Sequence, residues 1–536
     1  MNTACLIRHT SRGKVEGLLP LTGETLKWLG IPYAAPPVRK KRWRAPQPYA
    51  PWEGVRTAKK LSPVSLQRQG DAVIGSEDCL YLNIYRPNTE ENGLPVLFFI
   101  HGGNNQTGAG EMMDGDAMAI ALNAVVVTIN LRLNALGWLT LPVLKRGDSY
   151  GDSGNFGLLD ILSALNWTAE NIAAFGGDPG NITACGFSSG ARDLLCMLIS
   201  PAFRGKFARA LTFSGGFTAT DPEYGANIAA RAIAPLAVAD GMACSDEEAA
   251  QWLRTDDAAV RDWLYSISGK RLALLMPNAA IRMSVFPHLF ADGRLIPKEG
   301  FAVLSDGKEG TIPMMCLSGG REFSAHLNND LLFLKADFSD PEVAREYRFA
   351  AKYGGYLFGY INAEQNAKAF SAVPGHAPVY AGRCLWGMDP LVTDEYAAMR
   401  MGGTHGLDLY LIMGQECEDY AFSKNVWCDK NRKGREELAE IYRTYIRSFM
   451  RTGDPNSPGL PVWERWSGKG CLMRFDAGCQ HARVAMTQET ICEKAVFEEL
   501  LQDTSLTSDR KRYLLANVLS GRFFSENLDK FYREHF

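Results

Sequence analysis

The residues best placed to do chemistry stand in the pentapeptide Gly186-Phe187-Ser188-Ser189-Gly190, which has the pattern Gly-x-Ser-x-Gly. An apolar, β-branched run at 182–185 comes before it, and apolar residues at helical spacing follow it from Leu194 onward. A serine at a tight turn between a strand and a helix presents its hydroxyl above the sheet, where it can attack a carbonyl carbon. The helix places the positive end of its dipole beside that hydroxyl. The pattern and its setting therefore predict that Ser188 is a nucleophile.

The pattern alone is a weak signal, because residues 147–151 (Gly-Asp-Ser-Tyr-Gly) match it as well. Polar and charged residues flank this second copy, so neither a strand nor a helix is expected beside it. A motif predicts chemistry only in its structural context, and we therefore interpret the second copy as a loop. Residues 177–181 (Gly-Asp-Pro-Gly-Asn), ahead of the first copy, predict a turn that leads into the strand.

A serine hydroxyl becomes reactive when a base takes its proton and a third group orients that base. Where the serine lies on such an elbow, the acid and then the histidine follow it in the chain. His405 is the one downstream histidine in a glycine-flanked loop after a late predicted strand, and Glu322 comes just past a predicted strand at 312–317. We predict that His405 is the base and Glu322 its acid partner. The alternatives are a solvated loop histidine and a surface carboxylate beside Arg321.

The oxyanion of a tetrahedral intermediate needs preorganised N–H donors. Residues 101–104 (His-Gly-Gly-Asn) directly follow the continuous apolar strand predicted at 94–100. Glycine leaves backbone N–H groups bare, and asparagine tolerates left-handed backbone angles better than most residues. We therefore predict donors at Gly103, at Ser189 after the nucleophile, and at Asn104.

Length and patterning favour one large domain over residues 1–536, since no linker, repeat or low-complexity tract interrupts the chain. Strands alternate with helical patterns, which predicts an α/β fold with a mostly parallel sheet. The second half of residues 76–85 alternates like a half-buried strand. Helical insertions that cap the sheet are expected at 220–310 and 340–400, and a helical segment at 490–536.

Composition indicates which partners and compartment to expect. A net charge of −3 gives no reason to expect nucleic acid or an anionic membrane as partner, and no run of 18 apolar residues could span a bilayer. The first 12 residues lack a signal-peptide pattern. Twelve cysteines without Cys-x-x-Cys spacing are typical of free thiols in a reducing compartment, which predicts a cytoplasmic protein.

Motifs spread over residues 14–475 resemble those of the type-B carboxylesterase/cholinesterase family. The resemblance implies an α/β-hydrolase fold, ester hydrolysis through an acyl-serine intermediate, a Ser188–His405–Glu322 triad, a small ester substrate, and no metal or organic cofactor. It also implies ion pairs of Arg42 with Glu77 and of Arg132 with Asp160. Besides the elbow and the His101-Gly-Gly segment, these motifs carry the resemblance: Leu29-Gly-Ile-Pro-Tyr-Ala34, Ser76-Glu-Asp-Cys-Leu-Tyr-Leu-Asn83, Asn155-Phe-Gly-Leu-Leu-Asp160, Phe175-Gly-Gly-Asp-Pro179, His405-Gly-Leu-Asp408 and Phe449-Met-Arg-Thr-Gly-Asp-Pro-Asn456.

The chain departs from the family pattern around the predicted site. Phe187 replaces a glutamate, which argues against cationic choline-type substrates, and Asn104 replaces the third glycine of the usual His-Gly-Gly-Gly. Asn105 and Gln106 are expected to make the mouth of the site more polar. Arg192 and Asp193 are also unusual, and a local ion pair is the favoured interpretation over contact with a substrate carboxylate.

Two disulfides of secreted relatives cannot form here, according to the same resemblance. Ser65 occupies the position of the partner of Cys79, and Trp252 lies where the partner of Cys244 is usual. This supports a cytoplasmic and bacterial protein. Two other functions stay open: a catalytically silent binding protein of the same fold, and an amidase or thioesterase that uses the same triad.

Overall fold

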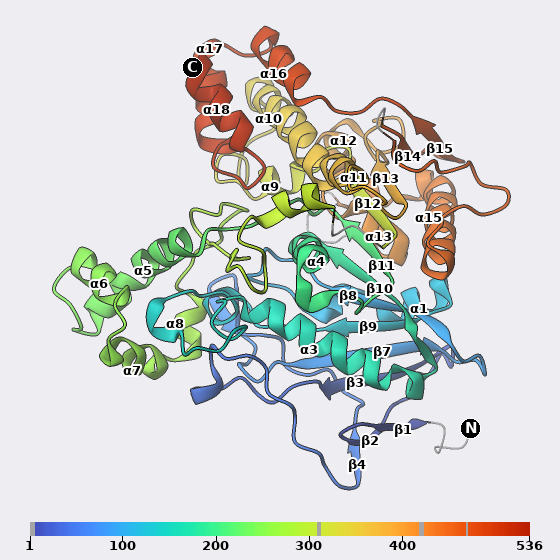
Figure 1. Ribbon diagram of the computed structural model, residues 1–536. Coiled ribbons are helices and arrows are strands. Elements are labelled where there is room, and N and C mark those ends of the chain that lie inside the picture. Colours follow the sequence, from blue (N-terminus) through green and yellow to red (C-terminus); the bar gives the residue numbers. More distant parts are fainter. Residues whose placement is uncertain (1–5, 308–311, 417–422, 468–469) are drawn as a thin grey trace. The chain divides into compact units, whose positions relative to one another are not determined.

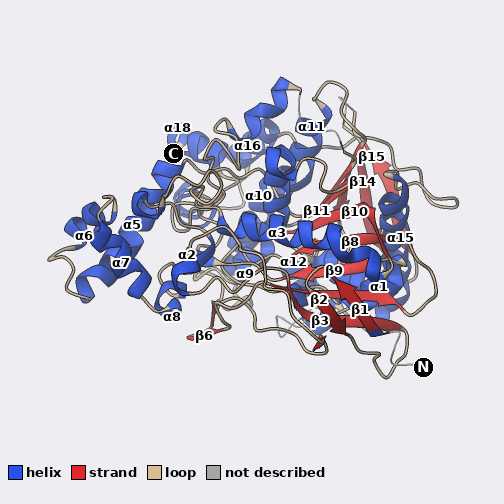
Figure 2. Ribbon diagram, turned by 60° about the horizontal axis from the view of Figure 1, so that its bottom comes forward, coloured by secondary structure: helices blue, strands red, loops and turns tan. Residues whose placement is uncertain are grey.

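The computed structural model describes residues 6–307, 312–416, 423–467 and 470–536, and the chain forms two compact units (Figures 1 and 2). The first unit contains residues 1–209 and 218–309, and the second contains residues 210–217 and 310–536. Each unit is described by itself below. The prediction of one domain stays a prediction.

Five strands of the first unit form a mixed sheet in the order β10-β8-β9-β7-β3. Strands β8, β9 and β10 are parallel, whereas β7 and β3 are antiparallel to their neighbours. A three-stranded sheet, β1-β2-β4, and a two-stranded sheet, β5-β6, are separate from it. The strands of this unit are β1 (Ile7–Thr10), β2 (Gly13–Glu16), β3 (Thr25–Pro32), β4 (Val55–Thr57), β5 (Gln67–Gln69), β6 (Ala72–Ile74), β7 (Tyr81–Pro87), β8 (Leu94–Ile100), β9 (Val125–Ile129) and β10 (Gly177–Phe187).

Helices of the first unit pack on this sheet or form a group of their own. Helix α1 packs against β7 and β9, whereas α3 and α4 pack against β10. Helices α5, α6 and α7 lie together to one side of the strands in Figures 1 and 2. The helices are α1 (Gly115–Leu122), α2 (Asn134–Gly137), α3 (Phe156–Asn171), α4 (Ser189–Ile199), α5 (Pro222–Ala239), α6 (Asp246–Leu253), α7 (Ala258–Ser266) and α8 (Gly269–Ala273).

In the second unit, strands β11 to β14 are parallel neighbours in chain order, and β15 runs antiparallel to β14. The strands are β11 (Arg209–Phe213, of which 210–213 belong to this unit), β12 (Met314–Gly319), β13 (Val379–Cys384), β14 (Leu472–Ala477) and β15 (Ala482–Thr487). The helices are α9 (Ser324–Asn328), α10 (Pro341–Gly359), α11 (Gln365–Ser371), α12 (Glu395–Met401), α13 (Leu407–Met413), α14 (Ser423–Val426), α15 (Arg432–Thr452), α16 (Glu493–Gln502), α17 (Ser508–Leu514) and α18 (Glu526–His535).

Most of the predicted elements are confirmed, and the corrections have physical reasons. All seven residues of β8 are buried, as its continuous apolar sequence predicts. The predicted half-buried strand is wrong in its burial, because six of the seven residues of β7 are buried and α1 packs on this strand. The predicted turn at 177–181 is extended backbone within β10. A register shift against β8 between Gly177 and Ile182 accommodates the extra residues.

The expected helical insertions are confirmed in part. Helices α5 to α8 lie between residues 222 and 273 of the first range, and residues 274–299 contain no helix. Residues 308–310 of this range lie outside the described residues, as do residues 1–5 of the segment searched for a signal peptide. Helices lie at 341–371 and 395–401 within the range 340–400, which also contains strand β13, and helices α16, α17 and α18 lie within 490–536. Whether the insertions cap the site stays a prediction.

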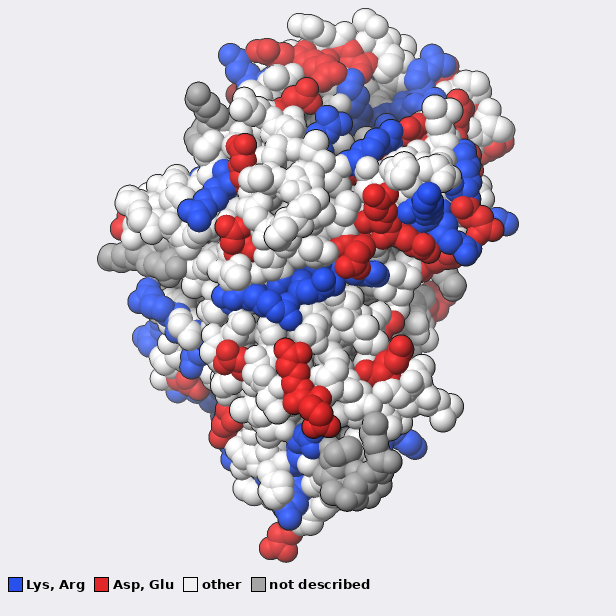
Figure 3. Space-filling model, turned by 90° about the vertical axis from the view of Figure 1, so that its right-hand side faces the viewer, with Lys and Arg blue, Asp and Glu red and all other residues white. Residues whose placement is uncertain are grey.

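The charged residues agree with the small net charge. The face in Figure 3 carries basic and acidic side chains close to one another, without a field of one sign over the whole face. Among the described helices, none combines the length and the apolar character that crossing a membrane requires.

Candidate functional site

Ser188 lies at a strained turn in the first unit, between the end of β10 and the start of α4. Its backbone angles are φ 55° and ψ −116°, which a residue other than glycine rarely adopts. The two flanking glycines permit close packing of the backbone. A Cβ on Gly186 would lie 2.3 Å from the Gly190 carbonyl oxygen, and a Cβ on Gly190 would lie 2.2 Å from the Ile100 carbonyl oxygen. The predicted strand–turn–helix context of Ser188 is confirmed.

The second Gly-x-Ser-x-Gly copy is a loop, as predicted. Residues 147–150 are exposed and in neither a helix nor a strand. The Asp152 carboxylate accepts hydrogen bonds from the backbone N–H groups of Arg146 and Gly147, and so closes a surface turn. Ser149 therefore does not lie between a strand and a helix, as a nucleophile elbow requires.

The loop after β8 packs directly against the elbow. A Cβ on Gly102 would lie 2.8 Å from the Phe187 ring and 3.0 Å from the Ser188 Cβ. Gly103 and Asn104 then turn the chain with φ of 107° and 56°. The positive φ at Asn104 is the left-handed backbone that asparagine was expected to tolerate. We call residues 103–106, which include the predicted oxyanion donors Gly103 and Asn104, the oxyanion loop.

His101 precedes this loop and is buried, with its Nδ1 bound to the Gly102 carbonyl oxygen at 2.7 Å. Burial lowers the pKa of the His101 imidazole to about 4, because the charged ring would lose its hydration. His101 is therefore neutral at physiological pH. Its Nδ1 donates the bond to the carbonyl.

Glu322 and His405 lie together in the second unit. The His405 Nδ1 is 2.5 Å from the Glu322 Oε2, and the Glu322 side chain is fully buried. His405 stands in the turn between α12 and α13, whereas Glu322 follows β12. The structure thus brings these two residues together, and their roles as base and acid partner stay a prediction. Ser188, Ser189, Gly103 and Asn104 belong to the first unit.

Sequence reasoning missed the groups that hold Glu322. The Glu322 Oε1 accepts from the Ser214 hydroxyl at 2.6 Å and also from the Gly319 N–H. The Asn362 side-chain amide donates to the Glu322 Oε2 at 3.3 Å. The Phe358 ring stacks on His405, with 5.5 Å between ring centroids. Ser214 could have been suspected, since it directly follows β11 and precedes two glycines.

The polar residues of the oxyanion loop differ in where they point. Asn104 and Gln106 line a cavity of about 300 Å³ together with Arg68, Met276 and Asn278. Its lining includes Gly103 but not Ser188, so its identity as the mouth of the site stays a prediction. Asn105 does not fit that prediction. Its side chain is buried and donates to the Asp193 carboxylate at 2.8 Å, because its positive φ turns it toward α4.

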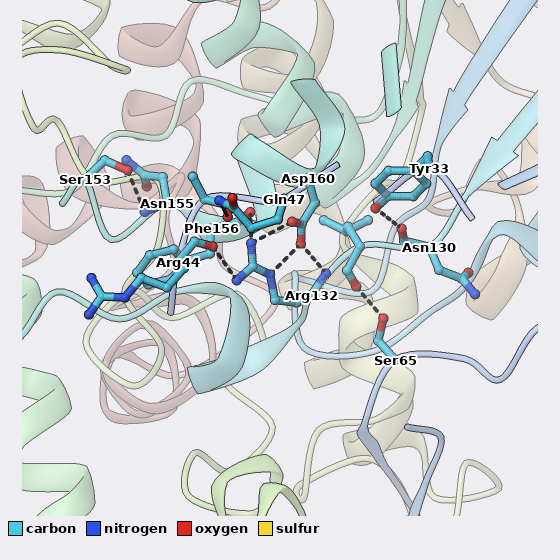
Figure 4. Close-up of polar contacts among 12 residues, drawn as sticks. Tyr33, Arg44, Gln47, Ser65, Asn130, Arg132, Ser153, Asn155, Phe156 and Asp160 are labelled. Atoms are coloured by element: carbon cyan, nitrogen blue, oxygen red, sulfur yellow. Dashed lines mark hydrogen bonds and ion pairs between the residues drawn. The ribbon is translucent and has the colours of Figure 1, made fainter. Parts of the chain in front are cut away.

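Both ion pairs implied by the resemblance are present in the first unit. Arg42 makes two hydrogen bonds to Glu77, at 2.8 and 2.6 Å. Asp160 is completely buried and accepts from the backbone N–H, Nε and Nη2 of Arg132 at 2.9, 2.8 and 2.7 Å (Figure 4). Figure 4 also shows the Ser65 hydroxyl, which donates to the Leu131 carbonyl. The Arg132–Asp160 hydrogen bonds hold α3 against the segment that follows β9.

Comparison with known proteins identifies the family. The sequence model of the carboxylesterase family matches residues 4–373, which is more than half of the chain. The chain belongs to the carboxylesterase family. The chain is 43% identical over 218 residues to a fumonisin B1 esterase of Sphingopyxis macrogoltabida, and 33% identical over 326 residues to a para-nitrobenzyl esterase of Bacillus subtilis (strain 168). These matches cover 39% and 57% of the chain, and span 40% and 60% of the relatives.

Solved structures of family members support the fold class. A carboxylesterase of Geobacillus stearothermophilus is similar with a TM-score of 0.69 and 29% identity, over 90% of this chain and 97% of that one. The prediction of an α/β-hydrolase fold, with a large mostly parallel sheet flanked by helices, is thereby confirmed.

Proposed function

We propose that this family member is a serine carboxylesterase that hydrolyses small carboxylic esters, with Ser188 as nucleophile, His405 as base and Glu322 as the acid partner. The observation that carries the proposal is the strained backbone of Ser188 against the oxyanion loop. Strained backbone of this kind is typical of active sites. The buried Glu322–His405 contact supports the same assignment.

In the proposed reaction, the Ser188 Oγ attacks the ester carbonyl carbon while His405 takes the hydroxyl proton. Backbone N–H groups of Gly103, Asn104 and Ser189 donate to the oxyanion that forms. The carbon–oxygen bond to the alcohol then breaks, and His405 gives its proton to the leaving alkoxide. Water attacks the acyl-serine with His405 again as base, which releases the carboxylic acid and restores the serine.

Glu322 serves this reaction by holding His405 in one tautomer. Its Oε2 accepts from the Nδ1–H, so that Nε2 is free of a proton and can take one from a hydroxyl. Ser214, Gly319 and Asn362 stabilise the negative charge of Glu322 with three hydrogen bonds. A carboxylate held in this way also stabilises the imidazolium during the reaction.

The preferred substrate is a neutral ester with a short or polar acyl group. Phe187 replaces the acidic residue expected before the nucleophile, so no carboxylate at that position favours a cationic alcohol. The cavity beside the oxyanion loop is about 300 Å³ and is lined by the amides of Asn104 and Gln106. The small volume of this cavity and its polar lining are both unfavourable for a long alkyl chain.

A panel of p-nitrophenyl esters from acetate to dodecanoate tests the proposal. We expect turnover with an optimum at short chains, and slower turnover of the p-nitroanilide and of the thioester with the same acyl group. Faster turnover of the anilide or thioester would replace the carboxylesterase assignment with an amidase or thioesterase. Binding of esters without turnover of any of the three would favour a binding protein.

We also infer that the protein works in a bacterial cytoplasm. Cys79 and Cys244, the two cysteines whose usual disulfide partners are missing, are both thiols here, and burial raises the pKa of the Cys79 thiol to about 12, which keeps it unreactive. Two of its relatives are bacterial esterases. Fractionation of cells that express the native gene tests this inference. Esterase activity recovered with a periplasmic marker would contradict it.

A further inference from the structure

The unusual residues of the oxyanion loop and those of α4 are bonded to one another. Arg192 donates from Nη2 to the Asn104 Oδ1 at 2.6 Å, and Asp193 accepts from the Asn105 Nδ2 at 2.8 Å. Two consecutive loop residues are therefore joined to two consecutive residues of the helix that begins after the nucleophile. Four departures from the family pattern, at residues 104, 105, 192 and 193, are therefore joined in pairs by hydrogen bonds, and we call them, with Gln106, the cluster.

The cluster continues from the loop to the segment after α8. The Asn104 Nδ2 donates to the Gln106 Oε1 at 3.1 Å, and that oxygen also accepts from the Ala279 N–H at 3.0 Å. The Gln106 Nε2 donates to the Pro277 carbonyl at 3.0 Å. The Asn104 amide is therefore held on both sides, by a donor from α4 and by an acceptor from the loop.

These bonds oppose the intrinsic preference of the loop backbone. Asn104 and Asn105 both have φ of 56°, the left-handed region that is unfavourable for residues with a side chain. Two adjacent residues in that region need outside contacts to persist. The bonds to Arg192 and Asp193 supply those contacts, and the loop carries two of the three proposed oxyanion donors.

Burial encloses the two α4 side chains of the cluster, whereas Asn104 and Gln106 line the cavity. Arg192 is 2% exposed and Asp193 is fully buried. Burial lowers the pKa of the Arg192 guanidinium to about 10, so it stays charged at neutral pH. The charge-assisted bond from Arg192 to Asn104 is stronger than a neutral one. A side chain so enclosed acts through Asn104 and does not bind a substrate carboxylate.

We propose that Arg192 and Asp193 are positioning residues that lock the oxyanion loop, so that the N–H groups of Gly103 and Asn104 point at the developing oxyanion. This inference rests on the proposed esterase function and deepens it. It predicts that loss of either α4 side chain harms the transition state more than substrate binding. A displacement of about 1 Å at such donors costs on the order of 100-fold in rate.

The test compares Arg192→Met with wild type on p-nitrophenyl acetate. We expect kcat to fall about 100-fold with KM changed less than threefold, and affinity for a trifluoromethyl ketone, which forms a tetrahedral adduct with serine, to fall in parallel. Equal losses in kcat for Arg192→Met and for a control would overturn the proposal. Arg209→Met is that control, since Arg209 bonds Asn181 in the same unit, at the end of β10 remote from the elbow.

A double-mutant cycle with Asn104→Gly separates positioning from general destabilisation. Glycine keeps the backbone N–H and tolerates φ of 56°, but it cannot accept from Arg192. We expect Arg192→Met to reduce kcat little further in the Asn104→Gly background, because the partner is already lost. Additive effects would overturn the proposal. If Arg192→Met fails to fold, Asp193→Leu, which cannot accept from Asn105, combined with Asn105→Gly offers the same comparison.

Failure of this inference is distinguishable from failure of the proposed function. If wild type turns over esters and the Ser188→Ala variant does not, the esterase assignment stands whatever the Arg192 variants do. A normal kcat in a folded Arg192→Met variant would then refute the locking role alone.

Discussion

The close approach of α4 to β8 predicts a large effect of adding one methyl group at Gly190. A Cβ there would lie 2.2 Å from the Ile100 carbonyl oxygen and 2.6 Å from that of His101. Ordinary contact begins near 3.4 Å, so the helix start and the strand end must separate by about 1.2 Å. Both obstacles are backbone atoms, which cannot rotate away as a side chain can.

This separation has two measurable consequences for Gly190→Ala. Overpacking of this kind destabilises by about 1–3 kcal/mol, and a shift of about 1 Å between nucleophile and oxyanion loop lowers kcat on the order of 100-fold. Urea unfolding and p-nitrophenyl acetate kinetics measure the two effects.

Gly180→Ala is the matched control for Gly190→Ala. Gly180 lies on the same strand–elbow segment, but only the Asp178 side-chain oxygen, at 3.2 Å, is near its added Cβ. We expect Gly180→Ala to retain the wild-type stability and rate. Wild-type activity and stability in Gly190→Ala would refute the reasoning that the two glycines set the geometry of the elbow.

Three further predictions follow from buried polar groups. Glu322→Gln should lower kcat by about 10⁴-fold with little change in KM, because the amide cannot both accept from His405 and satisfy Ser214 and Gly319; steady-state kinetics measure this, and a loss below tenfold contradicts it. Asp160→Asn should cost about 3–5 kcal/mol in urea unfolding because it leaves the Arg132 charge buried, whereas the exposed Asp509→Asn should cost under about 1 kcal/mol; equal costs would refute this. The folded pKa of His101 is lowered to about 4 from 6.5, so the unfolded chain takes up a proton first and stability falls as pH drops; between pH 7 and pH 5 this amounts to about 2 kcal/mol, which His101→Gln should remove from the pH dependence. If the stability of His101→Gln fell with pH as steeply as that of wild type, buried His101 would not be the cause of the pH dependence.

The features that were predicted correctly depend mostly on residues close together in the sequence. The elbow at Ser188 follows from a strand pattern, two glycines and a helical pattern within about twenty residues, and the structure has all three. The positive φ at Asn104 was predictable because few residue types tolerate it. Glu322 and His405, 83 residues apart, were paired from the order of acid and histidine after an elbow serine and from their places after predicted strands, and the family resemblance implied the same pair.

What the sequence did not predict depends on residues that only the fold brings together. Six of the seven residues of β7 are buried because α1 packs on this strand, and the alternation in its sequence gave no sign of that. Ser214 reaches Glu322 across 108 residues, and Arg192 reaches Asn104 across 88. Asn105 was misassigned to the mouth because side-chain direction depends on its backbone φ, which the sequence pattern does not determine.

The central claim is that Ser188 is the nucleophile, and covalent labelling tests it most directly. We predict that a fluorophosphonate adds one phosphonyl group to wild type, that peptide mass spectrometry locates the group on Ser188, and that Ser188→Ala loses both label and ester turnover by at least about 10⁴-fold. Ser149→Ala, in the exposed second copy of the motif, should keep both. A label on another serine, or turnover that survives in Ser188→Ala, would contradict the account.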